Sequence, residues 1–190
     1  MSTRKDKFSK KDKTYMRLAL NLAKIRHGLT GVNPSVGCVI VKNDEIISIG
    51  QTGFNGRPHA EYNAIKNSNE NLEGSKMYVT LEPCNHYGQT PPCTKQIIKH
   101  KISKVIYSVE DVDKKVKGKS FKILRSKDII VKKNLLSEEI NIFYKPYYFN
   151  RKKRIPYVTG KIAVSKNNLI YSKGTKKITD IHSDKLTHFL

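Results

Sequence analysis

One histidine, one glutamate and two cysteines stand in an order that suits a metal site for hydrolysis. His59 and Glu61 are separated by one alanine, Cys84 follows a proline, and Cys93 comes nine residues after Cys84. Zinc in hydrolytic sites is commonly held by three protein ligands and keeps one position for water. His59, Cys84 and Cys93 are therefore candidate ligands for one Zn²⁺ per chain.

Glu61 is the candidate proton carrier of this group, because it lies too close to His59 in sequence to be an independent ligand in most geometries. Bound zinc lowers the pKa of water toward about 7. A nearby carboxylate can take a proton from that water and return it to a leaving amine. The order His-x-Glu, Pro-Cys, Cys is typical of zinc deaminases whose Glu is not a ligand. The sequence therefore indicates a hydrolytic deaminase that acts on a nitrogen heterocycle.

The hydrophobic pattern indicates the helices and strands that must position this group. Helices are expected at residues 14–27, 60–67, 90–99, 119–126 and 137–147, and strands at 36–41, 46–49, 76–81, 104–109 and 128–133. A turn at Asn43-Asp44 joins the first two strands. Thr90 and Ser137 are expected as helix N-caps. The alternation predicts an α/β domain of three layers, α/β/α, with a mixed or mostly parallel sheet.

These elements should bring the three candidate ligands to one edge of the sheet. His59 lies where a loop meets a helix, Cys84 follows a strand, and Cys93 falls in the first turn of a helix. The free N–H groups of a helix N-terminus favour a thiolate. Cys38 lies inside a strand and is expected to be a small buried apolar residue. An odd number of cysteines without a signal peptide argues against a disulfide framework.

Three stretches resemble a known family: Asn33–Val41 (NPSVGCVIV), His59–Glu61 (HAE) and Thr80–Cys93 (TLEPCNHYGQTPPC). They are similar to the bacterial riboflavin-biosynthesis enzymes that join a diaminohydroxyphosphoribosylaminopyrimidine deaminase to a 5-amino-6-(5-phosphoribosylamino)uracil reductase. The similarity covers residues 14–190. It implies a cytidine-deaminase-like fold and loss of the ring amine of 2,5-diamino-6-ribosylamino-4(3H)-pyrimidinone 5′-phosphate as ammonia. It also implies that His59, Cys84 and Cys93 bind zinc and that Glu61 is the proton donor.

The same resemblance implies a set of substrate-binding residues: Asn33, His86, Gln89 and Asp111. Gln89 stands where some relatives have Lys or Arg near the phosphate, so one cation is missing. Asp111 lacks the Pro and Asn that commonly follow it in the family. The residues alone leave alternatives open: Asn33 as a turn former, His86 as an exposed loop residue and Asp111 as a strand-end cap.

The C-terminal part resembles the start of a dihydrofolate-reductase-like reductase domain. Strands are expected at 157–164 and 169–171, and a helix near Asp180. The resemblance implies that Ala163, Ser165, Thr175 and Lys177 lie near NADPH or the reductase substrate. The roughly forty residues after a basic linker at 151–154 fall below the smallest usual domain size. We therefore expect no reductase activity in this chain, and NADPH only where a complete reductase domain is present. Either the chain is a fragment of a bifunctional enzyme or its tail docks on a partner.

Three segments follow: a basic disordered tail at 1–13, a zinc deaminase domain at 14–150, and a linker with a reductase fragment at 151–190. The net charge is +21 over 190 residues, which could indicate nucleic-acid binding. Lysine is scattered, arginine is scarce and aromatic residues are not interleaved with basic ones, so a composition bias is the preferred interpretation. The charge would still attract a small phosphorylated pyrimidine.

No apolar run reaches the roughly 20 residues of a membrane span. The first residues lack the apolar stretch of a secretory signal. We therefore expect a cytoplasmic enzyme with no nucleic-acid or membrane partner, and a homo-oligomer stays open.

Two other functions compete. One is a deaminase of tRNA adenosine or of a free nucleobase, but such enzymes usually have Pro-Cys-x-x-Cys, whereas eight residues separate Cys84 and Cys93. The other is a non-catalytic, zinc-stabilised RNA-binding module. That module would keep its function when Glu61 is replaced by Ala, whereas a deaminase would lose turnover and retain zinc.

Overall fold

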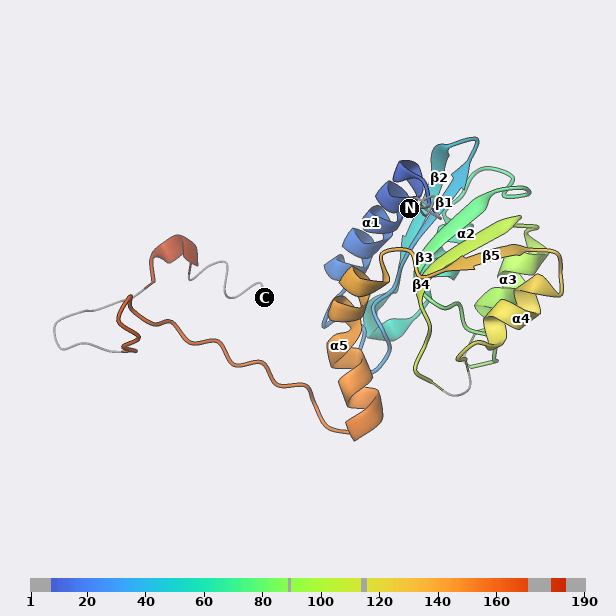
Figure 1. Cartoon of the computed structure of the whole chain (residues 1–190). Coiled ribbons are helices and arrows are strands. Elements are labelled where there is room, and N and C mark those ends of the chain that lie inside the picture. Colours follow the sequence, from blue (N-terminus) through green and yellow to red (C-terminus); the bar gives the residue numbers. More distant parts are fainter. Residues whose placement is uncertain (1–7, 89, 114–115, 171–178, 184–190) are drawn as a thin grey trace, which may run out of the picture. The chain divides into compact units, whose positions relative to one another are not determined.

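The computed structural model describes residues 8–88, 90–113, 116–170 and 179–183 (Figure 1). It divides into two compact units, residues 1–156 and residues 157–190. The first unit contains the sheet, its helices and residues 33–41, 59–61 and 80–93. No helix among the described residues is long and apolar enough to cross a membrane.

A five-stranded sheet forms the centre of the first unit. Its strands are β1 (Gly37–Lys42), β2 (Glu45–Gln51), β3 (Lys76–Leu81), β4 (Lys104–Val109) and β5 (Ile130–Lys133). The order across the sheet is β2-β1-β3-β4-β5. Strand β1 is antiparallel to both β2 and β3, whereas β3, β4 and β5 are parallel. The predicted mixed sheet and the Asn43-Asp44 turn, whose residues have φ values of 51° and 64°, are confirmed.

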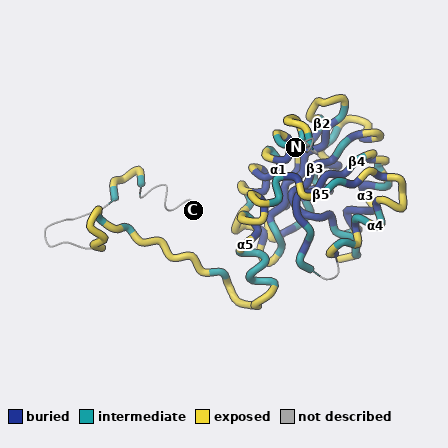
Figure 2. The backbone as a smooth tube through the Cα atoms, viewed as in Figure 1, coloured by how far each residue is buried: buried dark blue, intermediate teal, exposed yellow. Residues whose placement is uncertain are grey.

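Helices cover both faces of this sheet. Helices α1 (Lys10–Ile25) and α5 (Ser137–Lys153) lie on one face, and α2 (Ala60–Lys66), α3 (Cys93–Lys99) and α4 (Lys119–Arg125) lie on the other (Figure 1). A short 3₁₀ turn, η1 (Phe54–Gly56), precedes α2. The buried residues follow the strands and the inner sides of the helices (Figure 2). The predicted three-layer α/β/α architecture is confirmed.

A buried chain of hydrogen bonds ties α5 to the sheet. The Gly37 N–H donates to Thr80 Oγ1 (3.2 Å), and the Tyr144 hydroxyl donates to the Ser35 carbonyl (2.9 Å). Since the Tyr144 proton is used in this way, the Thr80 hydroxyl donates across the 2.6 Å between it and the Tyr144 oxygen. These hydrogen bonds fix the segment around Ser35, which precedes β1 and borders the candidate active site.

The first helix begins four residues earlier than predicted, at Lys10. Ser9 and Asp12 form a capping box, in which Ser9 Oγ accepts from the Asp12 N–H and Asp12 Oδ2 accepts from the Ser9 N–H. The Tyr78 hydroxyl also donates to Asp12 Oδ1 (2.6 Å). The prediction of disorder is therefore wrong for residues 10–13, because the cap and a contact to the sheet order this polar segment.

Two predicted N-caps are also wrong. Pro92, not Thr90, occupies the N-cap position of α3. In α5 that position belongs to Leu136, which has a left-handed backbone, and Ser137 is the first helical residue. Neither Pro92 nor Leu136 provides a capping side-chain hydrogen bond.

Helix α5 extends six residues beyond its predicted end, so residues 151–153 are helical and not a linker. It passes through Pro146, which normally breaks a helix interior. Aromatic rings contact one another on both sides of Pro146: the rings of Phe143 and Tyr144 lie 5.0 Å apart, and those of Tyr147 and Tyr148 lie 5.8 Å apart.

The second unit lacks the predicted strands in its described part. Residues 157–164 and 169–170 form no strand, and Tyr171 lies outside the described residues. The turn at Asn167-Asn168 is present, closed by the Ser165 N–H donating to the Leu169 carbonyl (2.9 Å). A helical turn at 181–183 follows Asp180, as predicted. Among the described residues of this unit no strand pairs with residues 157–164 or 169–170, and an isolated strand is not stable.

Candidate active site

The three candidate ligands converge at one edge of the sheet. His59 is the N-cap residue of α2, Cys84 follows β3, and Cys93 begins α3. His59 Nδ1 lies 3.4 Å from the Sγ of each cysteine, and the ligand atoms of all three residues lie within 4.8 Å of one another. One imidazole nitrogen and two sulfurs are a donor set that fits zinc. The predicted convergence of these residues is confirmed.

Glycine in the sheet allows α2 to approach closely enough to bring His59 to this edge. A Cβ on Gly50 of β2 would collide with the backbone of Ala60 and Ala64 in α2. The same holds on the other face, where a Cβ on Gly37 would collide with the carbonyl of Ala19 in α1. Both glycines are therefore required by helix–sheet packing.

The protonation of this group differs from that of the free side chains. Hydrogen bonds from Cys93 and His59 outweigh burial and lower the pKa of Cys84 to about 4. The pKa of Cys93 is raised, because it donates to Cys84 and is itself buried. Burial alone would lower the pKa of His59, but its hydrogen bond to Cys84 and the charge of Glu61 outweigh burial and raise it. Cys84 is thus a ready thiolate.

Glu61 lies in the first turn of α2 and is buried, with 3% of its surface exposed. Burial raises its pKa to about 7; the charge of His59 opposes this shift and that of Cys84 reinforces it. A carboxylate with a pKa near neutrality can both accept and return a proton. Cys38 lies in β1, fully buried, and is not part of the group that could hold a metal, which confirms its predicted packing role.

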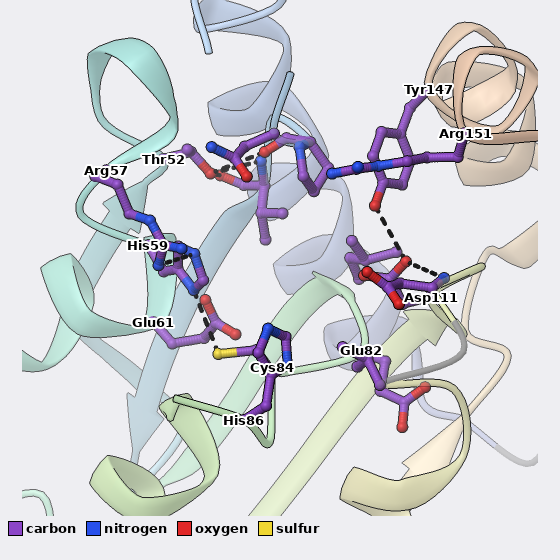
Figure 3. A pocket seen from close by; sticks show the side chains of 16 residues that line it. Thr52, Arg57, His59, Glu61, Glu82, Cys84, His86, Asp111, Tyr147 and Arg151 are labelled. Atoms are coloured by element: carbon purple, nitrogen blue, oxygen red, sulfur yellow. Dashed lines mark hydrogen bonds between the residues drawn. The ribbon is translucent and has the colours of Figure 1, made fainter. Parts of the chain in front are cut away.

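A pocket opens over this group, with an empty volume of about 640 Å³ when its open mouth is included. Asn33, His86 and Asp111 line it together with His59 and Glu61 (Figure 3). The structure therefore brings three of the four predicted substrate-binding residues to the pocket. The fourth, Gln89, lies outside the described residues.

The surroundings of His86 and Asp111 bear on whether these residues only shape their loops or also face the pocket. His86 is partly buried, and its Nδ1 has no hydrogen-bond partner among the described residues. Asp111 Oδ1 accepts from the Asp113 N–H (2.9 Å) and from the Tyr147 hydroxyl (3.1 Å). Asp111 therefore caps a turn after β4 and also faces the pocket. Burial raises its pKa, against the effect of these hydrogen bonds.

Glu82 lines the pocket and binds backbone N–H groups beside it. Its carboxylate accepts from the N–H groups of Gly118 (3.0 Å) and Ser120 (3.2 Å), and Ser120 Oγ donates to the Pro83 carbonyl. Burial raises the pKa of Glu82, while these hydrogen bonds oppose the shift. These hydrogen bonds of Glu82 and Ser120 hold the start of α4 against the segment after β3 that carries Cys84.

Sequence reasoning missed two basic residues of the pocket. Arg57 Nη1 lies 2.6 Å from His59 Nε2 and donates to Thr90 Oγ1 (3.0 Å). Its position two residues before His59 was a signal that could have identified it. Arg151 and Tyr147 lie one helical turn apart on α5 and also line the pocket. They belong to no motif, and their place in the pocket depends on tertiary packing.

The residues that the resemblance assigned to a reductase lie in the second unit. Ala163 and Ser165 are in its described part, where no strand forms. Thr175 and Lys177 lie outside the described residues. Their role therefore stays a prediction.

Known proteins resemble this chain in sequence and in fold. Residues 9–109 match the family model of the cytidine and deoxycytidylate deaminase zinc-binding region. The chain is 43% identical over 146 residues to the diaminohydroxyphosphoribosylamino-pyrimidine deaminase of Buchnera aphidicola subsp. Schizaphis graminum, covering 77% of this chain and 99% of that protein. It is 38% identical over 181 residues to the riboflavin biosynthesis protein RibD of Aquifex aeolicus, covering 94% of this chain and 51% of that protein.

Solved structures agree in fold. Acinetobacter baumannii RibD matches with a TM-score of 0.80 and 34% identity, covering 94% of this chain and 51% of that one. A deaminase/reductase from Thermotoga maritima matches with a TM-score of 0.79 and 33% identity, covering 94% of this chain and 52% of that one. This chain therefore spans about half the length of the RibD relatives and nearly all of the Buchnera deaminase.

Proposed function

This chain belongs to the diaminohydroxyphosphoribosylamino-pyrimidine deaminase family, and from that premise we propose its reaction. The chain removes the ring amine of 2,5-diamino-6-ribosylamino-4(3H)-pyrimidinone 5′-phosphate by zinc-dependent hydrolysis, as a step of riboflavin biosynthesis. The products are 5-amino-6-ribosylamino-pyrimidinedione 5′-phosphate and ammonia. The observation that supports this proposal most directly is the buried Glu61 beside the His59, Cys84 and Cys93 donor set, at a pocket that Glu61, His59 and Cys84 line.

His59 Nδ1 and the two cysteine sulfurs would hold the zinc ion. When bound, zinc supplies a Lewis acid that makes hydroxide available from water at neutral pH. The low pKa of Cys84 favours the thiolate that a metal requires. Cys93 gives up its proton on ligation, so loading releases a proton to solvent.

Glu61 moves the protons of the reaction. Its carboxylate takes one from the attacking water, and it returns one to the amine that leaves the ring as ammonia. Its pKa of about 7 keeps both protonation states populated near neutrality. Burial, which raises this pKa, therefore serves the chemistry.

Three side chains would orient the pyrimidine. The unpartnered His86 Nδ1 is available to a polar group of the ring. Asn33 adds an amide, and Asp111 adds a carboxylate held by Tyr147. The loop between Cys84 and Cys93 borders the same pocket through His86 and so separates the ring from bulk water.

Ammonia release from the diaminopyrimidine phosphate by the purified, zinc-loaded chain tests the proposal. The wild-type chain should turn over, and Glu61→Gln should not, while both contain one zinc per chain by mass spectrometry. Ammonia release from a tRNA anticodon stem or from a free nucleobase, with none from the diaminopyrimidine phosphate, would select the alternative deaminase instead. Retained activity in Glu61→Gln would refute the assigned role of Glu61.

The remaining assignments are predictions of the same proposal. A cytoplasmic location and the absence of a nucleic-acid or membrane partner are proposed from composition and family alone, and a homo-oligomer stays open. NADPH binding is proposed only for a chain with a complete reductase domain.

A further inference from the structure

The pocket contains more acidic than basic side chains around the proposed substrate. Four carboxylates line it: Glu61, Glu82, Asp111 and Asp113. Arg57 and Arg151 are the Arg or Lys side chains that line it within the described part of the chain. A substrate phosphate carries up to two negative charges at neutral pH, so it must reach a cation in this mostly acidic surrounding.

Arg57 is poorly placed for that phosphate. Its guanidinium contacts His59, which is a proposed metal ligand, and Thr90. The proposed reaction puts the amine-bearing ring carbon at these ligands and near Glu61. The phosphate is separated from that carbon by the rest of the ring and the whole ribosyl group. It must therefore lie away from His59.

Arg151 lies at the other side of the pocket. Its side chain extends from the last turn of α5 past Tyr147, whereas His59 comes from the start of α2 on the other side of the pocket (Figure 3). Its guanidinium carbon is 5.4 Å from the centre of the Tyr147 ring, and its Nη2 donates to the Val32 carbonyl (3.3 Å). These contacts hold the guanidinium at the side of the pocket that α5 forms.

The hydrogen-bonding state of Arg151 also indicates a ligand. Its Nε is buried and has no hydrogen-bond partner among the described residues. A buried donor without an acceptor is costly, and more so on a charged group. Arginine presents its donors in a planar fork that matches the oxygens of a phosphate.

From these observations we infer that Arg151 binds the 5′-phosphate of the substrate and makes the enzyme select phosphorylated pyrimidines. This inference rests on the proposed function for the identity of the substrate. A purely structural role, in which Arg151 only ties α5 to Val32, is the competing explanation. The two differ in kinetics, because a structural residue would not distinguish a phosphorylated substrate from its dephosphorylated form.

The test compares Arg151→Gln with Lys152→Gln, which removes one positive charge from an exposed neighbour outside this pocket. For the diaminopyrimidine phosphate, Arg151→Gln should raise KM about 10- to 100-fold and leave kcat within about threefold, as expected for the loss of one charge-assisted contact to the ground state and the transition state alike. Its kcat/KM for the dephosphorylated substrate should stay unchanged. Arg151→Lys should fall between wild type and Arg151→Gln, and Lys152→Gln should match wild type.

Equal losses of kcat/KM on both substrates in Arg151→Gln would overturn the inference in favour of a structural role. So would an unchanged KM for the phosphorylated substrate.

Calorimetric binding of ribose 5-phosphate separates this inference from the proposed function. If the wild-type chain released no ammonia but bound ribose 5-phosphate, and Arg151→Gln did not bind it, the phosphate site would stand without the reaction. If neither variant bound ribose 5-phosphate and no ammonia were released, both would fail.

Discussion

The guanidinium of Arg57 lies 2.6 Å from the Nε2 of His59. Arginine only donates, so Nε2 must accept, and the proton of the neutral ring then lies on Nδ1, which faces both cysteine sulfurs. A metal bound to Nδ1 needs the lone pair of that nitrogen and moves the proton to Nε2, where it would face the donors of Arg57. The Arg57 contact and metal ligation therefore compete for His59.

We predict that Arg57→Gln binds zinc more tightly than the wild-type chain. The Gln oxygen can accept from the Nε2–H of a metal-bound His59, whereas Arg57 must first move away. The zinc dissociation constant should fall by about tenfold, the lower end of effects from groups that orient a metal ligand. Competition with a chromophoric chelator measures it. Arg26→Gln removes a charge that stacks on Phe54 and should leave the constant unchanged, while weaker zinc binding by Arg57→Gln would contradict the argument.

Replacing Glu61 should abolish turnover without removing the metal. Gln at this position keeps the shape of the side chain but cannot take or return a proton. We expect kcat to fall by about 10²- to 10⁴-fold, the usual contribution of a positioned acid or base. Steady-state ammonia release gives kcat, and mass spectrometry gives the zinc content. A variant that lost zinc together with activity would show that Glu61 acts on the metal site itself.

The three cysteines provide a matched set for testing ligation. Cys84→Ala and Cys93→Ala should each lose the bound zinc, because one of three ligands is gone. Cys38→Ala should retain one zinc per chain and lose about 1 kcal/mol of unfolding free energy, since it removes a buried sulfur from β1. Metal analysis after dialysis and chemical denaturation measure the two effects. Zinc loss in Cys38→Ala would place the metal elsewhere.

Loss of the hydroxyl group should change the unfolding free energy differently at two buried tyrosines. Tyr144 connects Thr80 to Ser35, so Tyr144→Phe leaves buried partners unsatisfied and should cost about 1–3 kcal/mol of unfolding free energy. Tyr107 is equally buried, but its hydroxyl has no hydrogen-bond partner among the described residues. Tyr107→Phe should therefore be neutral or slightly stabilising. Denaturation with urea measures both, and equal losses would show that the Tyr144 hydrogen bonds add no net stability.

Local patterns predicted the sheet and the convergence of the metal ligands. Each strand from β1 to β5 has its own apolar run, and His59, Cys84 and Cys93 lie at element boundaries that the sequence marks. Parallel strands then place such boundaries at one edge. The beginning of α1 was missed although Ser9 and Asp12 form a local capping box; the contact that ties this end to the sheet, from the Tyr78 hydroxyl to Asp12, joins residues 66 positions apart.

Other features depended on contacts that no local pattern encodes. Helix α5 continues past Pro146, with aromatic rings in contact with one another on both sides of it. Arg151 reaches Val32 across 119 positions of sequence, so nothing near Arg151 indicated the pocket. The strands expected at 157–164 had suitable residues but no partner strand among the described residues of their unit. Tertiary packing decided each of these cases.

Asp12 should make the stability of the first unit depend on pH. Burial would raise the pKa of Asp12, but hydrogen bonds from Tyr78 and Ser9 outweigh it, so the folded-state pKa lies below 3.8. A carboxyl with a depressed pKa stabilises the fold above its unfolded pKa, and this contribution is lost as the pH falls through the folded value. Asp12→Asn, which keeps an acceptor but removes the charge, should therefore cost about 1–2 kcal/mol at pH 7.

The difference between wild type and Asp12→Asn should shrink steadily below pH 4 and vanish once Asp12 is protonated in both states. Urea denaturation at a series of pH values measures it. Glu70→Gln, at an exposed position, should stay within about 0.5 kcal/mol of wild type at pH 7. A difference for Asp12→Asn that is the same at pH 7 and at pH 2.5 would mean that shape and not charge determines the role of Asp12. The capping box would then act through its geometry alone.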